Sequence, residues 1–282
     1  MANSAKRGAM AGRLAAWALP CMLAVTLLQG CVNTRTNSVT GEPVAETRPE
    51  LVTDSDETPQ RRRARLRLEL ASSYFEADKT NIALDEIKQS LAADPDFSDA
   101  YNLRGLIYMR LGDNDLAEQS FRRAVQLNPR DGNAMHNQAW LLCQQKRYDE
   151  ADKVFAQAAA VPAYANVGRT MMAQGICQVR AGRNADAERT LLHAYELDPG
   201  NPITGFTLAT LMRQRGDLDR ARFYIRRVNN SEYATAESLW LGMRIERRLN
   251  DNLAVSQLGE QLRKRFPGSR EAAAYDSGAF DE

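Results

Sequence analysis

Two histidines and four cysteines are the side chains of this 282-residue chain that most often carry catalysis or bind metals. His136 and His193 have no serine or cysteine at the spacing of a nucleophile and its base, so neither is expected to serve a reaction. No two cysteines stand at metal-ligand spacing, which argues against a zinc or haem site. The glycines occur singly and form no phosphate-binding loop. We therefore expect no catalytic residue, no metal, no cofactor and no small-molecule substrate.

The charge balance of the chain argues against a further class of partner. The sequence has 37 Lys and Arg residues against 36 Asp and Glu residues, and 44% of its residues are apolar. A general nucleic-acid binder needs an excess of cations that displaces counterions from phosphate, and this chain has none. The apolar content is sufficient for a substantial core. We therefore expect a folded protein with no nucleic-acid partner.

Residues 1–30 have the composition of a signal peptide. Basic residues precede an apolar run from Leu14 to Leu28, which is shorter than the roughly 20 residues of a membrane-spanning helix. The run ends in Leu28-Gln29-Gly30-Cys31, which resembles a bacterial lipobox, although Gln29 is larger than the usual residue. The resemblance implies that Cys31 is acylated and becomes the mature N-terminus. The alternative is an ordinary secreted protein in which Cys31 is a free thiol.

The residues that follow Cys31 predict where the protein is held. In the lipobox pattern an aspartate directly after the cysteine retains a lipoprotein at the inner membrane, so Val32 implies the outer membrane. Residues 31–60 are rich in Thr, Glu, Asp and Pro and are predicted to form a flexible linker. Such a linker reaches roughly 30 Å and keeps the folded part near the periplasmic face of the membrane.

From residue 61 to residue 268 the sequence repeats with a period close to 34. Small residues recur in phase at Ala83, Ala117, Ala151, Ala187, Ala221 and Ala254. A bulky apolar residue follows each of them three to four positions later. Apolar residues within each half-unit are spaced as in an amphipathic helix, so each unit is predicted to be a helix, a turn and a second helix. The fold class expected is all-α, with six repeats and a C-terminal tail at 269–282.

This pattern resembles the tetratricopeptide repeat. The resemblance implies a right-handed superhelical solenoid whose concave surface is lined by the first helix of each unit. The consensus tryptophan is missing, because Tyr101 and Met171 stand at its position in two units. Two extra residues near Val161–Tyr164 are expected to loosen the junction of units three and four, either as a tolerated loop insertion or as a hinge.

Counting positions within each first helix predicts which residues face the concave side. The predicted partner-binding groove consists of Leu68, Phe75, Asn102, Leu106, Met109, His136, Trp140, Met172, Ile176 and Phe206, and the same count adds Cys143, Val179, Leu239 and Met243. An exposed apolar stripe of this kind, rimmed by Arg65, Arg110, Arg180 and Arg213, would bind an extended or helical segment of a partner. If the count is off by one, the same residues belong to the core instead.

Cys143 and Cys177 fall in the first helices of adjacent units and would meet an oxidising compartment after export. A disulfide between them is conceivable, although helix-based pairs seldom meet the geometry. Cys143 could equally line the groove.

The chain as a whole resembles the type IV pilus pilotin lipoproteins, the PilF/PilW/Tgl family. The local resemblance lies in four stretches, residues 137–142, 145–151, 238–244 and 262–269. It implies a non-enzymatic outer-membrane adaptor that binds the pilus secretin, a PilQ-like protein, and promotes its localisation and multimerisation. The alternative is a lipoprotein scaffold for outer-membrane β-barrel assembly or for peptidoglycan hydrolases.

Overall fold

The computed structural model describes residues 56–280, and this part of the chain consists of thirteen α-helices without a strand. The predicted signal peptide at 1–30, the acylation site Cys31 and most of the predicted linker lie outside the described residues. None of the helices within 56–280 is long and apolar enough to cross a membrane.

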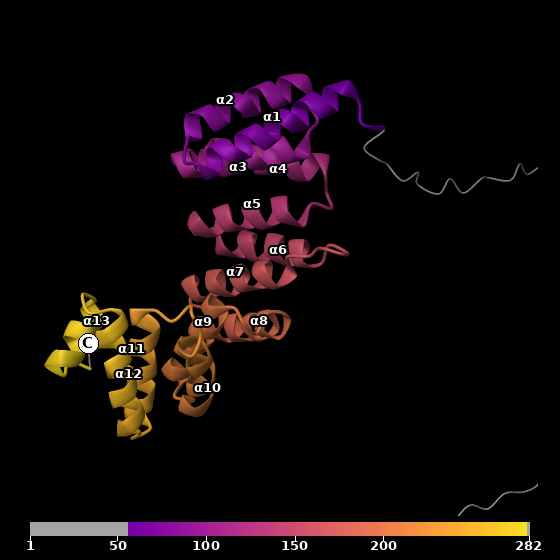
Figure 1. Cartoon of the computed structure of the whole chain (residues 1–282). Coiled ribbons are helices and arrows are strands. Elements are labelled where there is room, and N and C mark those ends of the chain that lie inside the picture. Colours follow the sequence, from indigo (N-terminus) through magenta and orange to yellow (C-terminus); the bar gives the residue numbers. More distant parts are fainter. Residues whose placement is uncertain (1–55, 281–282) are drawn as a thin grey trace, which may run out of the picture. The chain divides into compact units, whose positions relative to one another are not determined.

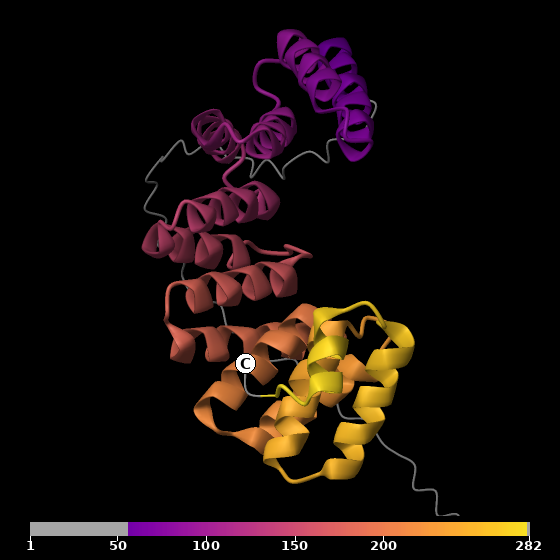
Figure 2. The same cartoon turned by 90° about the vertical axis from the view of Figure 1, so that its left-hand side faces the viewer.

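The helices follow one another as six antiparallel pairs and a last single helix (Figure 1). Each pair is one repeat, and Figure 2 shows the pairs from a second side. In chain order they are α1 (Pro59–Glu76), α2 (Thr80–Ala93), α3 (Ser98–Leu111), α4 (Asn114–Leu127), α5 (Gly132–Gln144), α6 (Tyr148–Ala159), α7 (Val167–Arg180), α8 (Asn184–Leu197), α9 (Pro202–Arg215), α10 (Leu218–Asn229), α11 (Ala236–Arg248), α12 (Asn252–Arg265) and α13 (Arg270–Ser277).

Short local signals set the turn between the two helices of a repeat. Gly112 ends α3 and Gly216 ends α9, both with the left-handed backbone that glycine adopts without strain. Asp113 and Asp217 then accept hydrogen bonds from the first-turn N–H groups of α4 and α10. A turn this short places the second helix antiparallel to the first.

The repeated alanines mark the positions where two helices come closest. Five of the six, up to Ala221, are fully buried, whereas Ala254 of the last repeat is half-buried. In two repeats the large residue four positions after the alanine, on the same helix, packs against a glycine of the opposite helix. A Cβ atom added to Gly105 would lie 2.5 Å from the ring of Phe121, and one added to Gly175 would lie 2.5 Å from Leu191. The pairing of small and large residues that the sequence predicts is therefore the packing rule of each repeat.

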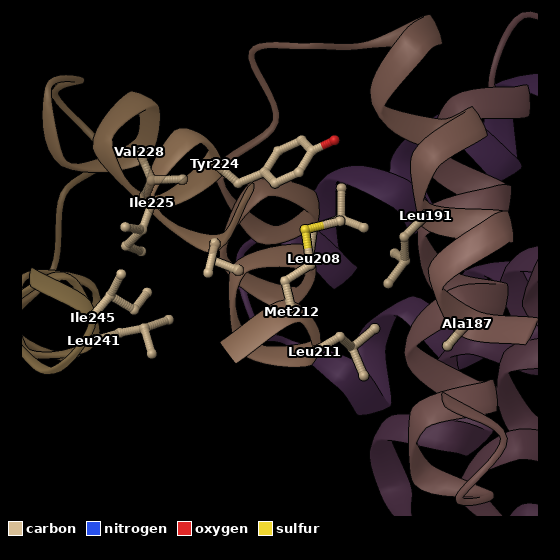
Figure 3. Close-up of a cluster of buried hydrophobic side chains, with 12 residues drawn as sticks. Ala187, Leu191, Leu208, Leu211, Met212, Tyr224, Ile225, Val228, Leu241 and Ile245 are labelled. Carbon is tan, nitrogen blue, oxygen red and sulfur yellow. The ribbon is translucent and has the colours of Figure 1, made fainter. Parts of the chain in front are cut away.

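The buried clusters cross the boundaries between repeats. In Figure 3, Leu208 and Met212 of α9 lie between Leu191 of α8 and Ile225 of α10, and Ile245 of α11 belongs to the same buried cluster. Because each repeat buries its apolar surface against the next, no repeat has a complete core of its own. The predicted all-α fold and repeat stack are confirmed.

Helix α13 is built from the residues predicted as a C-terminal tail. It contacts α11 and α12, and its Ala272 is buried in one cluster with Leu239 and Met243 of α11. Trp240 and Phe280 pack against this cluster, with their rings stacked at a centroid distance of 5.2 Å. The helix thereby covers the apolar end of the last repeat, as a terminal cap of a repeat stack must.

The two extra residues after α6 form a loop that is held in place. The Tyr164 ring packs against Gly132, and its hydroxyl lies 3.1 Å from the Thr170 hydroxyl of α7. The Asn166 amide donates to the Asn133 side-chain oxygen at 3.1 Å. The expectation of a loosened junction was therefore wrong, because the insertion links the starts of α5 and α7.

Candidate partner-binding surface

The first helices of the repeats, α1, α3, α5, α7, α9 and α11, form a continuous row that we call the inner row. Each of them contacts the first helix of the next repeat as well as its own partner helix. Polar groups join the row at its second step, where the Asn137 amide of α5 donates to the Asn102 oxygen of α3 at 2.9 Å. The predicted groove residues therefore come from one continuous surface.

Nine of the ten predicted groove residues lie half-buried on the inner row, with part of each side chain in the core and part at the surface. Leu106 shows why. It packs against the core cluster of the first repeat and also against the cluster around Phe121. The partial burial of these side chains is compatible with both interpretations left open by the sequence, groove and core.

His136 is the exception and is a core residue. Its side chain is 7% exposed and its ring meets the ring of Phe155 edge-on, with centroids 5.8 Å apart. Nδ1 lies 3.0 Å from the Thr170 hydroxyl of α7. Burial, together with the positive charge of Arg169, lowers the pKa of His136 to about 4. The prediction that His136 lines the groove was wrong, because α7 closes over it.

Three other residues from the positional count are also buried. Cys143 is bonded to Cys177, with Cα atoms 5.9 Å apart, so the disulfide left open by the sequence is present between α5 and α7. Leu239 and Met243 are fully buried in the cluster that α13 completes. The groove prediction fails for Leu239 and Met243 because a helix that the repeat pattern does not include packs against them.

The arginines predicted as a rim have other roles. Arg110 lies 3.8 Å from the ring centre of Phe75 and donates to the Phe75 carbonyl at 2.8 Å. Arg180 similarly lies 4.9 Å from the ring centre of Trp140. Arg65 instead binds Glu57 and Glu69. A guanidinium group therefore lies over the ring of each of two predicted groove residues, Phe75 and Trp140.

One apolar hollow was found only in the structure. It has a volume of about 210 Å³ and lies at the start of α9, between Ile203, Phe206, Val228 and Tyr233. Ile203 is 51% exposed and Tyr233 is 57% exposed. Of these residues, the positional count predicted only Phe206. Ile203 is the second residue of the same helix, a position that the count also assigns to the concave side. We call this site the Phe206 hollow.

No candidate metal centre is present within residues 56–280, where no three His, Cys, Asp or Glu side chains gather at binding distance. The inner row offers apolar side chains, aromatic rings and guanidinium groups. These are groups that bind other polypeptides.

Comparison with known families first defines the class of protein. Residues 68–132 and 120–153 match the tetratricopeptide-repeat family. YrrB, described as a tetratricopeptide-repeat protein with an unusual peptide-binding site, has a similar fold, with a TM-score of 0.54 over 68% of this chain and 97% of its own, at 14% identity. The chain contains tetratricopeptide repeats.

Two relatives then define the kinship more closely. The type IV pilus assembly protein PilF of Pseudomonas aeruginosa is 24% identical over 204 residues, which are 72% of this chain and 81% of PilF. A solved PilF structure matches this chain with a TM-score of 0.71 at 22% identity. The match covers 78% of this chain and 100% of the PilF chain. PilW, a type IV pilus biogenesis factor, has a TM-score of 0.67 at 28% identity over 75% of this chain and 97% of its own. The chain is homologous to PilF and PilW, as the sequence predicts.

Proposed function

We propose that the protein is an outer-membrane lipoprotein adaptor of the type IV pilus, which binds the pilus secretin and promotes its localisation and multimerisation. The observation that carries this proposal is the apolar inner row, which is built on the same repeat stack as PilF and PilW. Its action is reversible binding and needs no bond to be made or broken. Homology over most of the repeat region supports the assignment to the pilus.

The secretin contact is assigned to the first two repeats. Leu68 and Phe75 of α1 and Leu106 and Met109 of α3 are half-buried on adjacent helices of the inner row. Each side chain keeps a part of its apolar surface at the protein surface, where a partner segment can cover it. Met109 adds a flexible side chain that adapts to the shape of a partner. Arg110, which forms an ion pair with Asp78 at 3.3 Å, lies over the Phe75 ring at the same place.

The anchor is assigned to Cys31, which lies outside the described residues. Metabolic labelling with an isotopic fatty acid tests it directly: the wild type should carry the label and the Cys31→Ala variant should not. Several acyl chains hold a protein firmly on a membrane, so the variant should also leave the outer-membrane fraction. Label on the Cys31→Ala protein would contradict the assignment.

The secretin contact is tested with the double variant Leu106→Glu and Met109→Glu. Two buried or partly buried charges are unfavourable against an apolar partner, so secretin should no longer co-purify and SDS-resistant secretin rings should be lost. The matched control is Ile82→Glu on α2, which is 46% exposed and belongs to a second helix.

Both variants must first show the far-UV circular dichroism and cooperative melting of the wild type. Since Leu106 also contacts the core, the milder Leu106→Asn and Met109→Asn variants serve if the glutamates unfold the repeat. A folded variant that still retains secretin would overturn the proposal. Intact rings after deletion of the whole protein would point instead to another outer-membrane scaffold role.

A further inference from the structure

Four arginines surround a hollow between the fifth and sixth repeats. The hollow has a volume of about 430 Å³ and is lined by Arg213 of α9, by Arg244, Arg247 and Arg248 of α11, and by Phe280. We call it the arginine hollow. Of these arginines, the sequence pattern predicted only Arg213, as part of the groove rim.

None of these arginines forms an ion pair with an acid of residues 56–280. The acid nearest to them in the sequence, Glu246, is already occupied on the other side of α11. Its carboxylate lies 2.7 Å from Arg226 Nε and 3.1 Å from Arg222 Nε, both of α10. The positive charge of the arginine hollow is therefore uncompensated by the folded repeats.

Arg213 carries the strongest sign of a missing partner. Its Nε is buried and has no hydrogen-bond acceptor, and a buried donor without a partner is costly. Burial, together with the positive charges of Arg244 and Arg248, lowers the pKa of Arg213. An anion bound between these arginines would reduce the repulsion among their positive charges.

The geometry of guanidinium groups selects the chemistry of that anion. One guanidinium group donates two parallel hydrogen bonds to a carboxylate or to a phosphate, so the arginine hollow fits an oxyanion. Arg247 lies 4.5 Å from the ring centre of Phe280, which fixes one of the four cations against an aromatic wall. Four arginines together can bind more than one carboxylate.

A second feature on the same helix favours a peptide over a free anion. Phe206 precedes Arg213 by seven residues, or two helical turns, so the two side chains leave α9 on the same side, roughly 10 Å apart along its axis. Phe206 belongs to the apolar Phe206 hollow. An extended peptide covers that distance in about three residues.

We propose that the fifth and sixth repeats bind an acidic peptide segment of a partner, with its carboxylates in the arginine hollow and an apolar side chain about three residues away in the Phe206 hollow. This site is separate from the contact assigned to the first two repeats and does not depend on the partner being a secretin.

The test uses the purified full-length protein and a fluorescein-labelled peptide, Gly-Ser-Leu-Gly-Ser-Asp-Asp-Gly, with both ends blocked. Fluorescence anisotropy should show binding about tenfold weaker when both aspartates are replaced by asparagine, because charge-assisted bonds are lost. Replacing the leucine by glycine should also weaken binding. Arg213→Gln and Arg248→Gln should each reduce affinity for the aspartate peptide about tenfold.

The matched control is Arg63→Gln, an exposed arginine of α1, which should bind like the wild type. Leu106→Glu with Met109→Glu should also leave peptide affinity unchanged, so this proposal and the secretin proposal can fail separately. Arg213→Gln removes a repulsion, and its melting temperature should be no lower than that of the wild type. Arg248→Gln alters an exposed residue and keeps the test valid if Arg213→Gln melts early.

Four outcomes would overturn the proposal. Equal affinity for the aspartate and asparagine peptides would remove the role of the carboxylates. Displacement by inorganic phosphate with no dependence on leucine, or arginine-dependent binding to phosphatidylglycerol vesicles without peptide binding, would reassign the site to phosphate groups. Asp281 and Glu282 follow Phe280 in the chain; if the peptide binds only after both are changed to amides, the chain's own acids fill the site.

Discussion

Cys143 of α5 and Cys177 of α7 form a disulfide that joins the first helices of the third and fourth repeats. Both residues are about 1% exposed and belong to one core cluster with Phe155. The bond closes a stretch of 34 residues that also contains the loop with Tyr164. The middle of the inner row is therefore fixed covalently, whereas the other repeats of the described chain are held by packing and polar contacts.

Reduction of this disulfide should lower the free energy of unfolding by about 3–4 kcal/mol, the chain-entropy value for a loop of this length. Urea denaturation with and without dithiothreitol measures the difference on one unchanged sequence. The Cys143→Ala and Cys177→Ala double variant should start from the lower stability and show no response to reductant. Equal stability of the oxidised and reduced wild type would contradict the prediction.

Gly105 should not tolerate a methyl group. An added Cβ would lie 2.5 Å from the ring of Phe121, which is fully buried and has no free space to move into. We expect Gly105→Ala to cost about 1–3 kcal/mol, despite the better helix propensity of alanine. Gly200→Ala is the control, because its nearest contact is an ordinary 3.5 Å to Asp198. Thermal denaturation of both variants measures the change in stability. A Gly105→Ala protein that is more stable than the wild type would show that the Phe121 ring can shift.

Most of the fold could be predicted because its determinants are local and recur with the repeat. Buried alanines such as Ala117 and Ala187, each followed four positions later on the same helix by a large residue, fix the phase of every unit. Helix α13 could not be predicted in this way, because it lies outside the period. Its stability comes from contacts with Leu239 and Met243, which are distant in the sequence.

The binding surface was less predictable for a related reason. Whether a residue of a first helix is exposed depends on the neighbouring repeat as well as on its position in its own helix. His136 is covered by α7, which carries its hydroxyl partner Thr170, and no count within one repeat shows that. The arginine hollow brings Arg213 together with residues 31 or more positions later in the chain. The sequence alone does not distinguish Arg213 from a solvated arginine, because its lack of a hydrogen-bond acceptor is visible only in the structure.

The last two repeats are joined by a buried acid. Glu246 of α11 is 1% exposed and lies between Arg222 and Arg226 of α10. Glu246→Gln removes the charge but keeps the shape, so we expect a loss of about 1–3 kcal/mol, the usual range for a hydrogen bond to a charged group. Glu260→Gln, on the exposed side of α12, should change stability little. Chemical denaturation of both variants at low and high salt measures the change in the free energy of unfolding. No change for Glu246→Gln would show that hydration of Arg222 and Arg226 compensates for the lost ion pair.

The buried imidazole of His136 should make stability depend on pH in the acidic range. Its pKa in the folded protein is lowered to about 4, below the usual value near 6.5 that it regains on unfolding. Between these values the unfolded chain binds a proton that the folded protein does not, so stability is lost as pH falls from about 6.5 towards 4.

The full loss attributable to this side chain is roughly 3 kcal/mol, since each pKa unit corresponds to about 1.4 kcal/mol. Urea denaturation at a series of pH values from 7 to 4, in the wild type and in His136→Gln, isolates the contribution. The glutamine variant should be less stable at pH 7 because its packing against Phe155 is lost, but the difference from the wild type should narrow as the pH falls. His193→Gln, which changes an exposed histidine, controls for the loss of an imidazole. Parallel curves for wild type and His136→Gln would show that folding does not lower the pKa of His136.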